Sequence, residues 1–238
     1  MSSIIRIWIE IVFDITYLLT IWVLAACMFK KVAGVRPKDL PVAQNMMLAF
    51  VLLALGDTGH VGFRILAYYM GSLEAKLNIF GVQLSLTGAG TLTTAITVTF
   101  FYVIILDAWR KRFDRKYGVF EYILIIAAII RLILFISPGN QWNSVVPPFG
   151  WSVARNIPLM VQGLGVAFLI LRDAFRHKDK TFKLIGTMIL VSYSCYMPVI
   201  FLVQKVSWIG MLMIPKTIAY VAIAVVVYKE LFARARAS

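Results

Sequence analysis

This 238-residue sequence contains only two cysteines. Cys27 and Cys195 lie far apart inside apolar segments, so the sequence has neither the spacing of a metal or redox motif nor a disulfide framework. Histidine is equally scarce, with only His60 and His177 in the chain. Catalytic zinc sites need about three protein ligands, often histidines, so we predict no metal site and no cofactor.

Charged residues are also few. Charged residues make up 15% of the chain and apolar residues 61%, whereas soluble domains have roughly 25% and roughly 45–50%. The apolar residues fall in long runs, which excludes an ordinary soluble protein. We therefore predict an all-α, polytopic membrane protein whose residues 1–238 form a single seven-helix transmembrane domain.

Acidic residues are the rarest charged type, 11 against 24 basic residues, which gives a net charge of +13. The basic residues cluster at the ends of the apolar runs, as residues that set membrane orientation do. We therefore expect no nucleic acid partner. The expected partner of these charges is a lipid bilayer with anionic headgroups on its cytoplasmic side.

Seven segments are long and apolar enough to cross a bilayer, since a span needs about 20 such residues. The first carries Glu10 and Asp14 and lacks a basic n-region and a cleavage site, so it is interpreted as a retained span. The spans are predicted at 4–29, 42–70, 79–108, 119–137, 151–173, 183–204 and 207–231.

Orientation follows from the basic residues. Seventeen of the 24 fall on one side, in alternate loops and after the last span, while the other side has only Arg6, Lys76 and Lys205. The positive-inside rule then predicts an N-out, C-in topology. The plasma membrane is the expected location, because the sequence shows no targeting signal for another compartment.

Ionisable residues inside the spans form the candidate site, because each is costly in lipid unless it faces water or the bundle interior. Helical spacing puts Glu10 and Asp14 on one face of span one, and Asp57, His60 and Arg64 on one face of span two. The candidate ligand-binding residues are Glu10, Asp14, Asp57, His60, Arg64, Arg131, Arg155 and Lys216.

These residues lie in the outer half of the predicted bundle or near its middle, as an outward-facing polar cavity requires. A polar stripe in span three accompanies them: Gln83, Thr87, Thr91, Thr94 and Thr97. Gly56, Gly59 and Gly62 give span two a small face for close helix packing. Two structural interpretations stay open: arginines that snorkel to headgroups, and an internal ion pair of Lys216 with Asp57 or Asp14.

Three functions fit this pattern. The cations suit a carrier or binding protein for a small anionic or zwitterionic ligand, with the acids placed to couple protons to transport. An intramembrane enzyme acting on a lipid or isoprenoid-like substrate would use Asp57 or His60 as acid or base, the two candidate catalytic residues. The ligand, the choice between these classes and the oligomeric state are left open by the sequence.

The third function rests on a resemblance. Seven spans, an outside N-terminus, Lys216 in the last span and Tyr196-Met197-Pro198 in span six resemble the microbial rhodopsins. The resemblance implies a rhodopsin-like receptor with Lys216 as a reactive amine. The sequence departs from that family at Leu212, where an acidic residue is usual, and in span three, whose middle carries threonines where an acid is usual.

Overall fold

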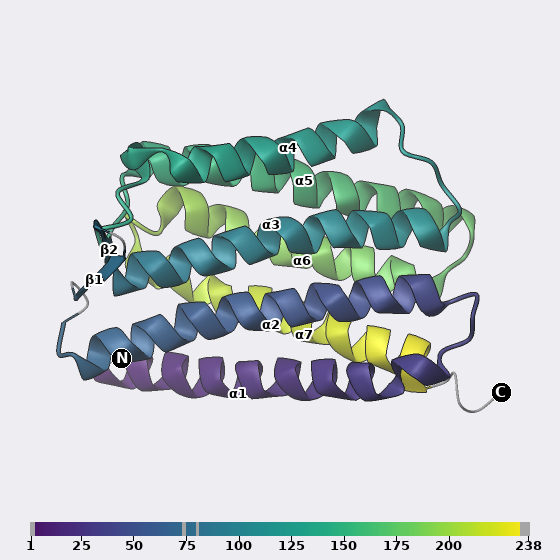
Figure 1. The fold of residues 1–238 in the computed structure, drawn as a ribbon, viewed down its shortest axis with the longest axis horizontal. Helices are drawn as coiled ribbons and strands as arrows, with labels where there is room; N and C mark the ends of the chain where they lie inside the picture. The colour runs from purple at the N-terminus through teal and green to yellow at the C-terminus, as the bar shows by residue number, and fades with distance from the viewer. Residues whose placement is uncertain (1–2, 73–74, 80, 234–238) are drawn as a thin grey trace.

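Seven membrane-length helices make up the fold. The computed structural model describes residues 3–72, 75–79 and 81–233, and within them seven helices are long and apolar enough to cross a membrane. They lie side by side in one bundle, with the two termini at opposite ends (Figure 1). The helices are α1 (Ser3–Lys31), α2 (Leu40–Tyr69), α3 (Leu86–Arg112), α4 (Val119–Ile136), α5 (Phe149–Arg176), α6 (Lys180–Leu202) and α7 (Met213–Val227). The predicted all-α seven-helix bundle is confirmed.

The connections divide between two ends. One end carries the strands β1 (Lys76–Ile79) and β2 (Val82–Ser85), the short helix η2 (Pro138–Asn140) and the join between α6 and α7 (Figure 1). We call it the hairpin end. The other, the basic end, carries η1 (Val32–Gly34), the turns after α3 and α5, and the C-terminus. Which end faces outward stays a prediction.

The predicted start of span three is wrong. Ile79 ends the first strand and Val82–Ser85 form the second strand of an antiparallel hairpin in which Lys76 pairs with Ser85, and Gly81 lies in the turn with φ +82°. The helix begins at Leu86 because the Ser85 hydroxyl caps it, accepting a hydrogen bond from the Gly88 backbone N–H at 2.9 Å. Gln83 is therefore an exposed strand residue, and the polar stripe of α3 starts at Thr87.

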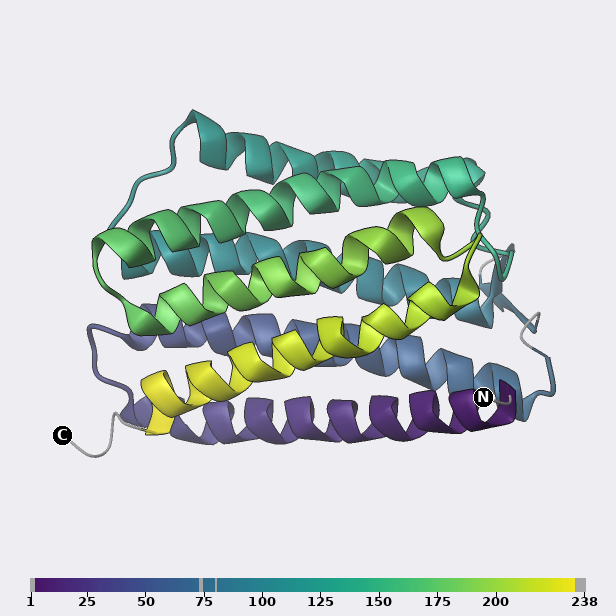
Figure 2. The ribbon, with the colours of Figure 1, turned by 180° about the vertical axis from the view of Figure 1, so that it is seen from behind.

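The last span begins in two stages. The helix η3 (Ser207–Leu212) is a 3₁₀ helix that leads directly into α7, and a π-helical turn, η4 (Tyr228–Ala233), follows it. Pro215 falls in the first turn of α7, where a proline is tolerated, and the helix continues past it to Val227. Seen from behind, α7 lies between α6 and α1 (Figure 2).

Helices α2 and α3 pack most closely where small residues meet. A Cβ added to Gly56 would overlap the Thr97 side chain, and one on Gly59 would lie 2.7 Å from Thr93 Cγ2. The predicted small face is thus confirmed at Gly56 and Gly59. Gly62 has no atom within 4 Å of an added Cβ, so it does not take part.

Aspartates pair with arginines and lysines at the basic end. The deepest is Asp173, 1% exposed, whose carboxylate accepts from Trp109 Nε1 at 3.0 Å and pairs with Arg115 and Arg172. In the turn after α3, burial raises the pKa of Tyr117, and the neighbouring Asp107 carboxylate raises it further. Ion pairs among Asp39, Asp107, Asp173, Asp179 and their arginine and lysine partners tie the loops of this end together.

Candidate functional site

A cavity of about 520 Å³ lies inside the hairpin half of the bundle, and residues of all seven helices line it. Seven of the eight predicted ligand-binding residues are in its lining: Asp14, Asp57, His60, Arg64, Arg131, Arg155 and Lys216. Glu10 is on α1, but its side chain lies outside the part of the chain that the structure describes. The fold thus brings the scattered charges together in one place.

The cavity stops at a common depth in the bundle. On α3 the last lining residue is Val98, and the fully buried Phe101 follows; on α2, Leu53 and Phe50 stand in the same relation. On α1, α6 and α7 the last lining residues are Tyr17, Ser192 and Tyr220. The buried Ile21, Ile189 and Ile223 follow them about one turn closer to the basic end. Packed apolar side chains therefore close the cavity toward the basic end.

Toward the hairpin end the cavity reaches the surface of the molecule. Its lining there includes Ser152 in the first turn of α5, and Gln204 and Ser207 from the join between α6 and α7. Gln204 and Ser207 are exposed. The cavity is accordingly a one-sided pocket whose rim lies at the hairpin end.

One wall of the cavity comes from α1 and α2; we call it the acidic wall because it carries both acids of the lining, Asp14 and Asp57, although Arg64 of α2 also lines it. The Asp57 carboxylate accepts a hydrogen bond from the Tyr17 hydroxyl at 2.5 Å and another from the Thr94 hydroxyl at 2.9 Å. Asp14 lines the cavity one turn before Tyr17 on α1. Three helices thereby hold the Asp57 carboxylate in a fixed position at the cavity surface.

His60 lies one turn from Asp57 on the same wall, where α2 and α3 are close: a Cβ added to Gly90 would lie 3.0 Å from His60 Cα. Within the described part of the chain, the buried His60 Nδ1 has no hydrogen-bond partner. The hydrogen bonds to Asp57 come from the Tyr17 and Thr94 hydroxyls and not from His60 Nδ1.

The opposite wall is cationic, and Arg131 is its most deeply buried member at 2% exposed. Its guanidinium donates to the carbonyl oxygens of Ala95 and Arg155 at 3.1 and 3.0 Å, and to the Thr99 hydroxyl at 2.7 Å. These contacts point into the bundle, so Arg131 does not snorkel toward headgroups. All three partners are neutral.

Arg155 and Lys216 also have neutral neighbours. The Arg155 guanidinium lies 4.5 Å from the centre of the Trp142 ring and donates to Asn140 Oδ1 at 3.4 Å. The Lys216 ammonium lies 4.6 Å from the centre of the Tyr196 ring and 5.8 Å from that of Tyr220.

None of these three cations forms an ion pair with an acidic side chain that the structure describes. The alternative in which Lys216 pairs with Asp57 or Asp14 is therefore wrong for this arrangement. The cationic wall is held by carbonyl oxygens, hydroxyls and aromatic rings.

Two polar residues of the site escaped the sequence analysis: Asn156 in the cavity lining and Asn140 outside it. Asn156 receives a hydrogen bond from the Tyr196 hydroxyl at 3.0 Å, and Asn140 contacts Arg155 from the loop after α4. Asn156 directly follows an intramembrane arginine, and this adjacency was the available signal. Asn140 sits among loop residues, where an asparagine is ordinary.

The chemistry of the site is limited by its donor set. Among the described residues, no three His, Cys, Asp or Glu side chains gather closely enough to hold a metal ion, and this includes Asp14, Asp57 and His60. The comparisons with known proteins return no match: no family model, no curated protein and no solved structure matches this chain. The cavity geometry therefore carries the functional argument.

Proposed function

We propose that this membrane protein binds a small anionic or zwitterionic ligand in the cavity of its hairpin half. The observation that carries the proposal is the set of three lining cations, Arg131, Arg155 and Lys216, that have no acidic partner among the described residues. A buried charge without a counter-charge is costly, and an anionic group in the cavity offsets that cost for all three.

The acidic wall extends the proposal to zwitterions. Asp57 and Asp14 come from α1 and α2, whereas Arg131, Arg155 and Lys216 come from α4, α5 and α7. A ligand with an acidic group at one end and an ammonium at the other matches this separation of charge. The volume of about 520 Å³ falls within the range of roughly 300–1,000 Å³ typical of small-molecule sites.

We further propose that the protein resides in the plasma membrane with the hairpin end outside, so that the ligand enters from the external solution. The packed apolar half of the bundle favours a pocket that is open at one end and disfavours a channel that is open at both ends. Transport would require that half to open, with Asp57 or His60 carrying the coupled proton.

Thermal stability in the presence of candidate ligands tests the proposal. Purified protein is heated with a panel of small carboxylates, phosphates, amino acids and betaines. A ligand at 100 times its Kd stabilises the folded state by about 2.7 kcal/mol, which raises the midpoint by about 5–10 °C for a chain of this size. Arg155→Met and Lys216→Met should abolish the shift. A panel that shifts neither the wild type nor any variant contradicts the proposal.

A second candidate, a retinal-binding receptor, is favoured by one observation. The Lys216 ammonium lies inside the cavity beside the Tyr196 and Tyr220 rings, as a reactive amine beside a conjugated chain would. Retinal added to the purified protein should then give a visible absorbance band that Lys216→Met removes. A colourless mixture eliminates this candidate and leaves the first untouched.

A further inference from the structure

A second hollow, of about 770 Å³, lies at the basic end, at the opposite end of the bundle from the cavity rim. Three segments form it: the loop between α1 and α2, the end of α3, and the turn between α5 and α6. We call it the lysine cleft, after Lys38, Lys178 and Lys180 in its lining. His177 and Phe113 stack in its wall with ring centres 5.5 Å apart.

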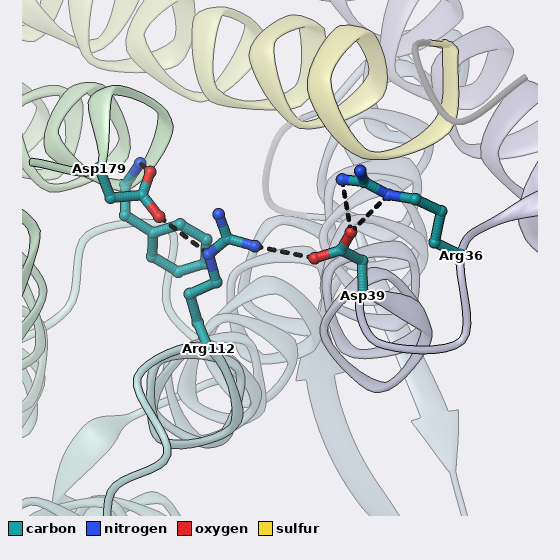
Figure 3. Close-up of polar contacts among 5 residues, drawn as sticks. Arg36, Asp39, Arg112 and Asp179 are labelled. Carbon is teal, nitrogen blue, oxygen red and sulfur yellow. Dashed lines mark hydrogen bonds and ion pairs between the residues drawn. The ribbon is translucent and has the colours of Figure 1, made fainter. Parts of the chain in front are cut away.

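A chain of ion pairs forms the frame of the cleft (Figure 3). Arg112, at the end of α3, donates to Asp179 at 2.8 Å and to Asp39 at 2.9 Å, and Asp39 also pairs with Arg36 at 2.8 Å. Figure 3 shows Arg112 between the two carboxylates, so one side chain connects the segments before α2 and α6. Asp39 and Asp179 are largely buried, which fixes the frame.

These aspartates are fully engaged by the protein itself. Asp179 also accepts a hydrogen bond from the Phe182 backbone N–H at 3.0 Å and so caps α6, while the Arg112 guanidinium lies over the Phe182 ring. The charges of Asp39 and Asp179 are therefore neutralised by Arg36 and Arg112. The start of α6 is occupied by its own cap and contributes no binding site.

The lysines of the cleft are a surplus beyond this network. Lys38, Lys178 and Lys180 are exposed, and none pairs with an acidic side chain that the structure describes. Asp114 is the one lining acid outside the ion-pair chain. The cleft therefore presents three exposed ammonium groups and the Asp114 carboxylate around a frame whose charges are already paired.

We propose that the lysine cleft binds an anion with a terminal phosphate group. Lysine ammonium groups are strongly hydrated point charges that contact phosphate oxygens from several directions. The cleft also lies at the helix ends, the level at which lipid headgroups meet the protein, where basic pockets between membrane helices bind phosphate-rich headgroups. Both a phosphomonoester lipid headgroup and a soluble phosphate compound carry the required chemistry.

The test compares two triple variants with the same change in charge. Lys38→Gln/Lys178→Gln/Lys180→Gln empties the cleft of its lysines. The control, Lys116→Gln/Lys183→Gln/Lys229→Gln, removes three equally exposed lysines of the same end that do not line the cleft. Thermal unfolding verifies that each variant folds, and Lys38→Gln alone serves should the cleft triple variant not fold.

Two probes separate the sources of phosphate. Protein is reconstituted in phosphatidylcholine nanodiscs with and without phosphatidic acid, and native mass spectrometry measures retained lipid; sodium pyrophosphate in phosphatidylcholine nanodiscs is the soluble arm. Each lysine near the surface contributes about fivefold, so the cleft variant should lose about a hundredfold in affinity while the control changes little. Retention of phosphatidic acid assigns the site to a lipid, and binding of pyrophosphate alone assigns it to a soluble anion.

Two outcomes overturn the proposal. Equal losses in the cleft and control variants would mean that the whole basic end attracts anions without a site. Absence of binding in both arms would mean that the surplus lysines serve orientation in the membrane only.

Discussion

Tyr17 and Asp57 show at the scale of single residues how the acidic wall is held. The Tyr17 side chain is 7% exposed, and its hydroxyl donates to the Asp57 carboxylate at 2.5 Å. A hydrogen bond to a charged group contributes about 1.5–3 kcal/mol, and its loss leaves the carboxylate partly unsatisfied. We expect Tyr17→Phe to lower the free energy of unfolding by about 2 kcal/mol.

Denaturant titration of the protein in detergent measures this loss. Tyr69→Phe is the matched control, because that side chain is 88% exposed at the end of α2. Equal effects of the two changes would show that the Tyr17 hydroxyl does not hold Asp57.

Lys216 gives a prediction in which stability and binding move in opposite directions. Its ammonium faces aromatic rings and has no ion pair with a described acid. A buried charge with poor compensation has an effective desolvation penalty of several kcal/mol, and an apolar side chain of similar length removes that penalty. Lys216→Met should therefore raise the melting temperature and abolish the ligand-induced shift.

The control for that change is Lys205→Met, which alters an exposed lysine in the turn after α6 and should leave both quantities unchanged. Calorimetry with and without a ligand found in the panel measures both effects. A lower melting temperature for Lys216→Met would mean that the ammonium is a structural contact.

Residue identity was more predictable than residue contacts. Asp57, Arg131 and Lys216 stood out because an ionisable residue inside an apolar run is rare and costly. Their partners were not predictable, since Arg131 bonds the carbonyl oxygen of Ala95, and every residue has such an oxygen. A pairing of opposite charges is the natural expectation from sequence, and in this cavity it is wrong for Lys216.

At the scale of elements, two glycines of α2 differ in role: Gly56 packs against α3, whereas Gly62 has no neighbour at the Cβ position and affects only the stability of its own helix. A Cβ on Gly56 would overlap Thr97 and lie 3.2 Å from the Thr94 backbone. We expect Gly56→Ala to destabilise the protein by about 1–3 kcal/mol through overpacking. Gly62→Ala meets open space, so it should stabilise by about 0.5–1 kcal/mol through helix propensity alone.

A double variant makes the interpretation specific. Removing the Thr97 side chain in Gly56→Ala/Thr97→Ala should restore part of the loss, because the two positions share one contact. The coupling is measured from the unfolding free energies of the wild type, Gly56→Ala, Thr97→Ala and the double variant. Equal destabilisation by Gly56→Ala and Gly62→Ala would show that the α2–α3 contact does not depend on the small face.

The elements themselves were predictable because a span is a run of apolar residues of fixed length, and such runs leave little choice of structure. The error fell at the start of α3, where apolar residues continue through the hairpin and the run gives no boundary. The boundary is set by the Ser85 cap and by the turn at Gly81. These are local hydrogen-bond effects that a count of apolar residues does not register.

At the scale of the whole molecule, the two halves of the bundle differ in how they treat charge. The hairpin half encloses charged residues around a cavity, the middle is packed with apolar side chains, and the basic end is tied by ion pairs. Ligand access therefore depends on which end faces outward. If the basic end is cytoplasmic, the cavity opens to the external solution.

That orientation is testable by cysteine labelling in intact cells. Cys27 and Cys195 are first replaced by alanine, and single cysteines are then placed at Val146 in the hairpin-end loop or at Lys116 in the basic-end turn. The excess of basic residues at one end predicts that this end stays in the cytoplasm. A membrane-impermeant maleimide should label Val146→Cys in intact cells and Lys116→Cys only after lysis. The reverse pattern would turn the cavity toward the cytoplasm and make its ligand a cytoplasmic metabolite, while leaving the charge argument for an anionic or zwitterionic ligand intact.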